Sequence, residues 1–292
     1  MPRTNLKHYI HLHFLVLIWG FTAILGALIS IDAIPLVWYR MLIAVIIVFI
    51  YFLIKKKPIK ISFKLLIKLF IGGVIIAVHW ITFFSAIKVA NVSVALVSMS
   101  TGALFTSLIE PLFFKRKLDF LELFFGLLVI SGLYIIFNVE TDYTLGIIYA
   151  LISSFLSALF TVLNGLYIKQ HDAEIISFYQ LFFGVVFITA FVFFTTGFSF
   201  EDYSLTTNDI IYLFILSSIC TAYAFIVSVK LMKYLTPYTV MLTINLEPIY
   251  GIILAVLIFG EKEKMSPQFY MGAAIIFITV VINGILKNKK TT

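Results

Sequence analysis

The residue best placed to do chemistry is Glu247, an acidic side chain near the middle of a long apolar run. An isolated ionised carboxylate in hydrocarbon costs at least ~2.5 kcal/mol, and such groups often mark an ion or proton pathway. Thr239, Thr243 and Tyr250 recur with Glu247 at helical spacing, so one helix face carries all four. Glu247 could bind and release a proton as its surroundings change. Its alternative role is a hydrogen bond across helices beside Pro248.

A second ionisable group, His79, also lies deep within an apolar run, with Phe83 one helical turn later. Its ordinary pKa of about 6.5 lies near physiological pH, so this histidine could titrate or bind a small molecule. A buried histidine that serves only packing fits the same pattern. His79 and Arg40 are the candidate partners of Glu247, and we predict coupling roles for Glu247 and His79.

Further polar and aromatic side chains lie away from the ends of the apolar runs, where an interfacial aromatic belt would not place them. Small hydroxyl residues also permit close helix packing, so packing remains an alternative for the serine and threonines. A cavity with aromatic walls would suit an apolar or aromatic amino acid. The predicted substrate-binding residues are Trp19, His79, Phe83, Ser98, Thr101, Asn164, Tyr179, Tyr223 and Thr243.

The composition assigns the chain to a class: 62% of its 292 residues are hydrophobic, 12% are charged, and the mean hydropathy is +1.11. About a quarter of the residues of a soluble domain are charged, so this composition predicts a chain that lies within the lipid bilayer. The single cysteine, Cys220, excludes a disulfide within the chain and a thiolate metal site. We expect no nucleic-acid partner, because the basic residues form short clusters between apolar runs. We also expect no metal and no cofactor.

Ten apolar runs are long enough to cross ~30 Å of hydrocarbon as helices. They lack the strict alternation of membrane strands, so we predict an all-α integral membrane protein with ten transmembrane helices. The expected spans are Leu12–Ser30, Pro35–Ile54, Leu65–Ile87, Val92–Phe114, Phe120–Phe137, Leu145–Ile168, Ile175–Thr195, Ile210–Leu231, Tyr238–Phe259 and Gln268–Leu286.

The distribution of lysine and arginine predicts the orientation, because cytoplasmic loops retain positive charge. If the N-terminus is cytoplasmic, the opposite side keeps only Lys88, Lys262 and Lys264, while Arg40 lies within a span. Both termini should then be cytoplasmic, in a multi-pass protein of the cell membrane. A signal peptide is the alternative for the first run, but that run is too long and further spans follow.

Two halves of similar pattern, residues 1–140 and 141–292, each hold five of the expected spans. An odd number of spans per half inverts the second half in the membrane, an arrangement used by carriers with a midplane site. The shared dipeptide suggests that Glu110-Pro111 and Glu247-Pro248 are equivalent positions of the two halves. The loop lengths instead align Glu247 with Thr101. The two glutamates are therefore not equivalent, and Glu110 can reach toward Lys115 or Arg116 at the helix end.

The sequence resembles the drug/metabolite transporter superfamily, specifically its ten-helix EamA-type carriers, over essentially the whole chain. The matching stretches are Leu17-Ile18-Trp19-Gly20-Phe21, Tyr39-Arg40, Phe84-Ser85-Ala86-Ile87-Lys88, Asn91-Val92-Ser93-Val94-Ala95, Leu246-Glu247-Pro248 and Phe259-Gly260-Glu261-Lys262. Lys115-Arg116-Lys117 departs from the pattern, because the family often repeats Gly-Glu there. The resemblance implies two inverted five-helix repeats, a central cavity between them, and secondary transport, often export, of amino acids or related metabolites.

These observations predict a secondary active transporter, an exporter of small metabolites such as amino acids, with alternating access around a midplane cavity and protons as the candidate coupling ion. No clustered catalytic set or ATP-binding loop supports an enzyme or a pump. A channel, and a non-transport membrane protein with a structural or regulatory partner role, remain alternatives. We expect a monomer or a weak homodimer.

Overall fold

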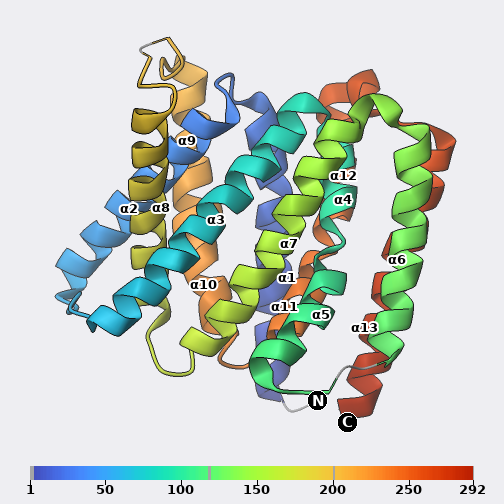
Figure 1. The fold of residues 1–292 in the computed structure, drawn as a ribbon, viewed down its shortest axis with the longest axis horizontal. Helices are drawn as coiled ribbons and strands as arrows, with labels where there is room; N and C mark the ends of the chain where they lie inside the picture. Colours follow the sequence, from blue (N-terminus) through green and yellow to red (C-terminus); the bar gives the residue numbers. More distant parts are fainter. Residues whose placement is uncertain (1–2, 118–119, 200, 292) are drawn as a thin grey trace.

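The computed structural model describes residues 3–117, 120–199 and 201–291, and within these ranges the chain is helical without strands. Figure 1 shows the helices as a bundle. The helices of the first half are α1 (Arg3–Leu28), α2 (Ala33–Lys55), α3 (Phe63–Val89), α4 (Val92–Met99), α5 (Gly102–Phe114) and α6 (Phe120–Val139). A 3₁₀ turn, η1 (Thr141–Tyr143), joins the halves. The second half holds α7 (Thr144–Tyr167), α8 (Ala173–Phe194), α9 (Thr207–Ser217), the π-helix η2 (Ser218–Tyr223), α10 (Ala224–Leu231), α11 (Pro237–Ile244), α12 (Glu247–Phe259), the 3₁₀ turn η3 (Gly260–Glu263) and α13 (Pro267–Thr291).

Eight stretches of the described chain are long and apolar enough to cross a membrane as helices. Two shorter apolar helices, Phe124–Val139 and Pro267–Thr279, lie in α6 and α13. The chain is thus a multi-pass membrane protein, and the tenfold count stays a prediction for α6 and α13. These two helices pair along their length (Figure 1). A Cβ added at Gly132 would lie 2.8 Å from the Gly272 carbonyl oxygen, so only glycine allows this close approach.

The fourth and ninth expected spans are each broken into two helices. Asn91 and Thr236 cap α4 and α11 with their side chains, both of these helices have 8 residues, and both following helices, α5 and α12, have 13. The breaks meet in space, because Asn245 Nδ2 donates to the Ser100 carbonyl at 2.8 Å. Glu247 opens α12 whereas Glu110 lies near the end of α5, so the two glutamates are not equivalent, as the loop lengths predict.

The halves pack through matching pairs of helices. In the first half α3 packs against α7 and α8, and in the second half α9 and η2 pack against α1 and α2. The equivalent helices α2 and α8 contact each other across the halves. In Figure 1, α1 and α7, the first helices of the two halves, run in opposite directions. This packing is that of an inverted repeat, with the core buried between the halves.

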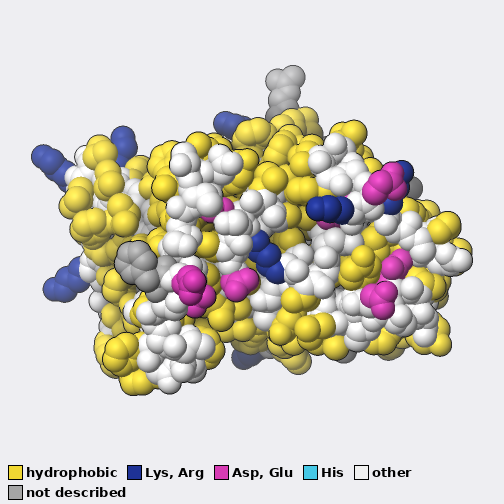
Figure 2. Space-filling model, turned by 90° about the horizontal axis from the view of Figure 1, so that it is seen from above, with side chains coloured by type: hydrophobic (Ala, Val, Ile, Leu, Met, Phe, Trp, Pro, Cys, Tyr) yellow, Lys and Arg dark blue, Asp and Glu magenta, His cyan; other side chains and the backbone are white. Residues whose placement is uncertain are grey.

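The beginning of α1 and the end of α13 lie at the same end of the bundle (Figure 1). The connections that follow α2, α5, α7 and α10, which carry the lysine clusters, lie toward that end as well. Figure 2 views the opposite end, where Asp and Glu side chains and some Lys and Arg side chains are scattered over a surface of hydrophobic and other groups. This placement of the lysine clusters agrees with their position in every second connection of the sequence. The cytoplasmic orientation of the termini stays a prediction.

Two buried carboxylates tie the halves together at the end opposite the termini. Asp209 accepts bonds from the backbone nitrogen and the hydroxyl of Ser30, both at 2.7 Å. Glu263, only 4% exposed, accepts bonds from the Val92 and Ser93 nitrogens at 2.9 Å and from Ser93 Oγ at 2.8 Å. At the terminal end the halves meet through a more exposed ion pair, in which Lys57 Nζ lies 3.0 Å from Glu174 Oε1.

Candidate functional site

A cavity of about 80 Å³ lies between the two halves. A cavity needs roughly 10–15 Å³ of such space to hold one water, so this one has room for several waters or a small solute. Its walls come from both halves, and we call it the central cavity. Its lining residues are Trp19, Thr22, Arg40, His79, Trp80, Phe83, Met99, Ser157, Phe160, Thr161, Cys220, Phe225, Ser228, Met232, Val240, Ile244 and Glu247.

Glu247 lies in the wall of this cavity as the first residue of α12. The break before α12 brings it there, and the positive end of the helix dipole lies beside its carboxylate. Among the described residues, no hydrogen bond to its carboxylate and no ion pair within 4 Å is formed. A carboxylate that faces a cavity without a protein partner is free to bind a proton or a cationic group.

Arg40 is the buried cation of the same cavity, at 2% exposure. Its Nε donates to Thr221 Oγ1 at 2.6 Å, and its guanidinium carbon lies 3.9 Å from the centre of the Trp80 ring. The π-helix presents Thr221, whose hydroxyl in turn donates to the Leu216 carbonyl five residues earlier at 2.7 Å. A π-helix inside an α-helical span is rare and frequently marks a functional site.

His79 is anchored to α7 on one side of its ring. Nδ1 lies 2.9 Å from the Ser153 carbonyl oxygen, and the Ser153 hydroxyl donates to the His79 carbonyl at 2.8 Å. Nδ1 also lies 2.8 Å from Ser153 Oγ, whose single proton is used in the bond to the His79 carbonyl. Both oxygens beside Nδ1 therefore accept, and we assign the proton to Nδ1, which leaves Nε2 as an acceptor. His79 therefore offers the central cavity a hydrogen-bond acceptor.

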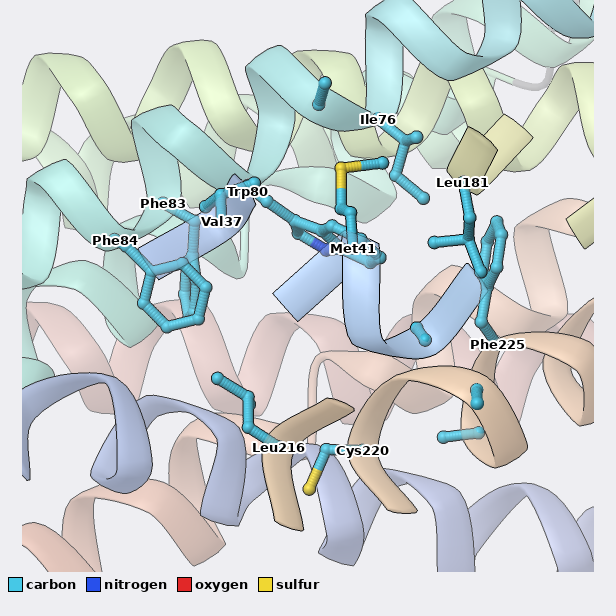
Figure 3. Close-up of a cluster of buried hydrophobic side chains, with 14 of the residues drawn as sticks. Val37, Met41, Ile76, Trp80, Phe83, Phe84, Leu181, Leu216, Cys220 and Phe225 are labelled. Carbon is cyan, nitrogen blue, oxygen red and sulfur yellow. The ribbon is translucent and has the colours of Figure 1, made fainter. Parts of the chain in front are cut away.

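Aromatic rings form the apolar part of the wall. Trp80 and Phe225 meet edge to face at 6.1 Å between ring centres, and Phe160 lies 5.5 Å from the His79 ring and 6.1 Å from the Phe225 ring. Figure 3 shows Trp80, Phe83 and Phe225 within one buried hydrophobic cluster, together with Met41. Such walls exclude water from a bound solute and favour apolar groups.

Four predicted site residues line the central cavity: Trp19, His79, Phe83 and Glu247. The other six do not line it in this structure, and their substrate roles stay predictions. The structure places them as follows: Ser98, buried in α4; Thr101, with Oγ1 2.9 Å from Ser154 Oγ; Asn164, accepting from Gln180 Nε2 at 2.7 Å; Tyr179, donating to the Ile59 carbonyl at 2.8 Å; Tyr223, with its hydroxyl 2.9 Å from His11 Nε2; and Thr243, donating to the Thr239 carbonyl at 2.9 Å.

Sequence reasoning missed the anchoring of Arg40, because nothing in the sequence marks Thr221 as the residue that a π-helix turns toward it. Glu110 lies with Oε2 3.6 Å from Arg116 Nη2, as predicted for a residue at the helix end.

A second, larger hollow of about 840 Å³ lies at the terminal end of the bundle, between the α2–α3 connection and the end of α10. Its walls include Lys60, Lys169, Lys233 and Met232. Met232 also lines the central cavity, so the two spaces adjoin at this side chain. We call this hollow the vestibule, because it brings solvent close to the central cavity.

The model of the EamA-like transporter family matches the chain twice, over residues 7–138 and 144–285. The chain belongs to the EamA-like transporter family. Each match covers one half of the bundle, so the family's repeat and the structural halves coincide. Membership places this EamA-like protein among transporters rather than enzymes, with a small-molecule substrate and a lipid surround.

A solved crystal structure of a protein is similar to this chain, with a TM-score of 0.71 and 13% sequence identity. The similarity covers 96% of this chain and 98% of the chain in the solved structure. At that identity the likeness shows the fold alone. The comparison with curated proteins gave no match.

Proposed function

We propose that this EamA-like protein is a secondary transporter that exports small metabolites such as amino acids across the cell membrane, driven by protons. The observation that carries the proposal is Glu247, a carboxylate without a partner among the described side chains, in a cavity that both inverted halves enclose. Inverted repeats around a central site, with broken helices at that site, suit alternating access.

Proton and substrate would compete for the same carboxylate. An amino acid carries an ammonium group, which Glu247 can bind only when it is ionised, whereas a proton neutralises it. His79 Nε2 offers a second acceptor to the ammonium group. Binding of one species therefore excludes the other, and an inward proton gradient would drive the substrate outward by exchange.

The vestibule supports a route from the terminal end. Only Met232 is shared between the vestibule and the central cavity, and an unbranched methionine side chain can change rotamer readily. The opposite end is closed by the buried bonds of Asp209 and Glu263. Exchange would then require these bonds to break while the terminal end closes.

The test is counterflow of labelled amino acids in proteoliposomes at several pH values, comparing the native chain with Glu247→Gln. We expect saturable flux whose pH dependence is lost in the variant, because a glutamine binds no proton. Glu110→Gln is the matched control, since it removes a membrane-embedded acid that does not line the central cavity. Saturable flux with unchanged pH dependence in Glu247→Gln would return Glu247 to a packing role; absence of flux with every amino acid would contradict the substrate class.

A further inference from the structure

Arg40 is a buried cation whose hydrogen-bonding capacity is only partly used. Nε is bonded to Thr221, but the buried Nη1 has no hydrogen-bond partner among the residues that the structure describes. The structure describes every acid of the cavity wall, and none lies within 4 Å of the guanidinium. An unsatisfied buried donor is unfavourable, the more so when it is charged. Such a donor beside a cavity points to a ligand that completes its bonding.

The surroundings hold the guanidinium in place. Its carbon lies 3.9 Å from the centre of the Trp80 ring and 5.4 Å from that of the Phe84 ring, so two aromatic rings flank the group. The bond from Nε to Thr221 holds one edge of the plane, which leaves Nη1 on another. A planar fork held in this way matches a carboxylate better than a mobile lysine would.

The charges of the cavity restrict the ligand further. The wall holds one arginine and one glutamate, so a solute with one anionic and one cationic group would be balanced there. A doubly charged phosphate would meet a single cation and the repulsion of Glu247. The remaining walls are aromatic, through Phe83, Phe160 and Phe225, and suit an apolar side chain.

We infer that Arg40, positioned by Thr221 and Trp80, binds the carboxylate of the transported solute, and that this solute is an α-amino acid with an apolar side chain whose ammonium group faces Glu247. Thr221 is a positioning residue in this arrangement, because it acts through Arg40. The inference rests on the proposed function and adds a requirement to it: the carboxylate itself must be recognised.

The experiment compares pairs of solutes that differ only in the carboxylate. Leucine and phenylalanine, with leucinamide and phenylalaninamide, compete against labelled leucine or phenylalanine in counterflow. For the native protein we expect each amino acid to compete at least about 10-fold better than its amide, since a hydrogen bond to a charged group is worth roughly 1.5–3 kcal/mol. In Arg40→Gln that preference should fall to near 1.

Thr221→Val provides a second variant that keeps the charge of Arg40 and nearly the same side-chain volume. We expect it to fold and to lower the preference for the carboxylate without abolishing flux, which a purely structural residue would not do. Lys262→Gln removes an exposed cation at the far end of the bundle and should keep the native preference.

Different results would contradict the role of Arg40 and the transport of amino acids. Saturable flux in the native protein with equal competition by acid and amide would overturn the role of Arg40 and leave transport intact. The same holds if both Arg40→Gln and Thr221→Val retain the native preference. No flux of any amino acid in the native protein would overturn the proposed function and this inference together.

Discussion

Glu263 should contribute to stability far more than its neighbour Glu261 in the same 3₁₀ turn. Glu263 is 4% exposed and accepts three hydrogen bonds from Val92 and Ser93 across the halves. The Glu261 side chain is 83% exposed and, within the described part of the chain, pairs with Lys264, three residues away. The pair Glu263→Gln and Glu261→Gln therefore removes one charge from each kind of environment at the same place in the chain.

The cost of Glu263→Gln can be worked from these contacts. The glutamine carbonyl can keep one backbone bond, but its NH₂ group then faces the other backbone N–H, and two donors cannot bond. Loss of one bond to a charged group costs roughly 1.5–3 kcal/mol, and the N–H left unsatisfied adds to it. We expect a loss of at least ~2 kcal/mol, which lowers the Tm by roughly 4–8 °C at about 2–4 °C per kcal/mol. Glu261→Gln should cost ~0–1 kcal/mol.

The assay is thermal unfolding of the purified protein in one detergent at neutral pH, followed by tryptophan fluorescence. Ser93→Ala should lie between the two glutamate variants, because it removes only the hydroxyl bond at 2.8 Å. If Glu263→Gln unfolds within about 1 °C of Glu261→Gln, the buried carboxylate does not join the halves in the way described.

Gly272→Ala should lower the free energy of unfolding by ~1–3 kcal/mol, because the added Cβ would lie 2.7 Å from the Gly132 carbonyl oxygen. The control is Gly126→Ala, whose Cβ would meet the end of the Leu104 side chain and should cost less in the same thermal assay. Equal losses in the two variants would contradict the close approach of α6 and α13. The hydrogen bond to Glu174 raises the pKa of Lys57 above its ordinary 10.5, so while Glu174 is ionised the pair stabilises the fold fully below that pH and is lost as pH rises through the raised value. Lys57→Met should therefore cost up to ~1 kcal/mol with the same difference throughout the neutral and mildly alkaline range, and a difference that shrinks already near neutral pH would refute this assignment.

The sequence predicts much of this fold because lipid imposes simple rules on the chain. The apolar runs and the lysine clusters between them correspond to helices and their connections, and Glu247 and His79 stand out because charge is rare in hydrocarbon. The family prediction is confirmed by the two matches of the family model. Each of these features is local in sequence and can be recognised without a partner.

The helix breaks and the π-helix were not predictable in the same way, because their stability depends on distant residues. The break at Ser100 is tolerated because Asn245, far along the chain, bonds the freed carbonyl. Thr221 is distinguished by its place in the π-helix and by its bond from Arg40, and neither can be recognised from the residues beside it. The small residues Ser98, Ser100, Thr101 and Gly102 are a local signal that could have marked the first break.

The two ends of the bundle differ in how strongly they should respond to ionic strength. The Lys57–Glu174 pair at the terminal end is partly exposed, with 38% of the lysine side chain accessible, so dissolved ions screen it over a Debye length of about 8 Å at physiological salt. The bonds of Asp209 and Glu263 at the other end are buried from those ions. Raising the salt concentration therefore weakens a contact between the halves at the terminal end and leaves the buried contacts at the other end, so electrolyte alone should bias how readily each end of the protein opens.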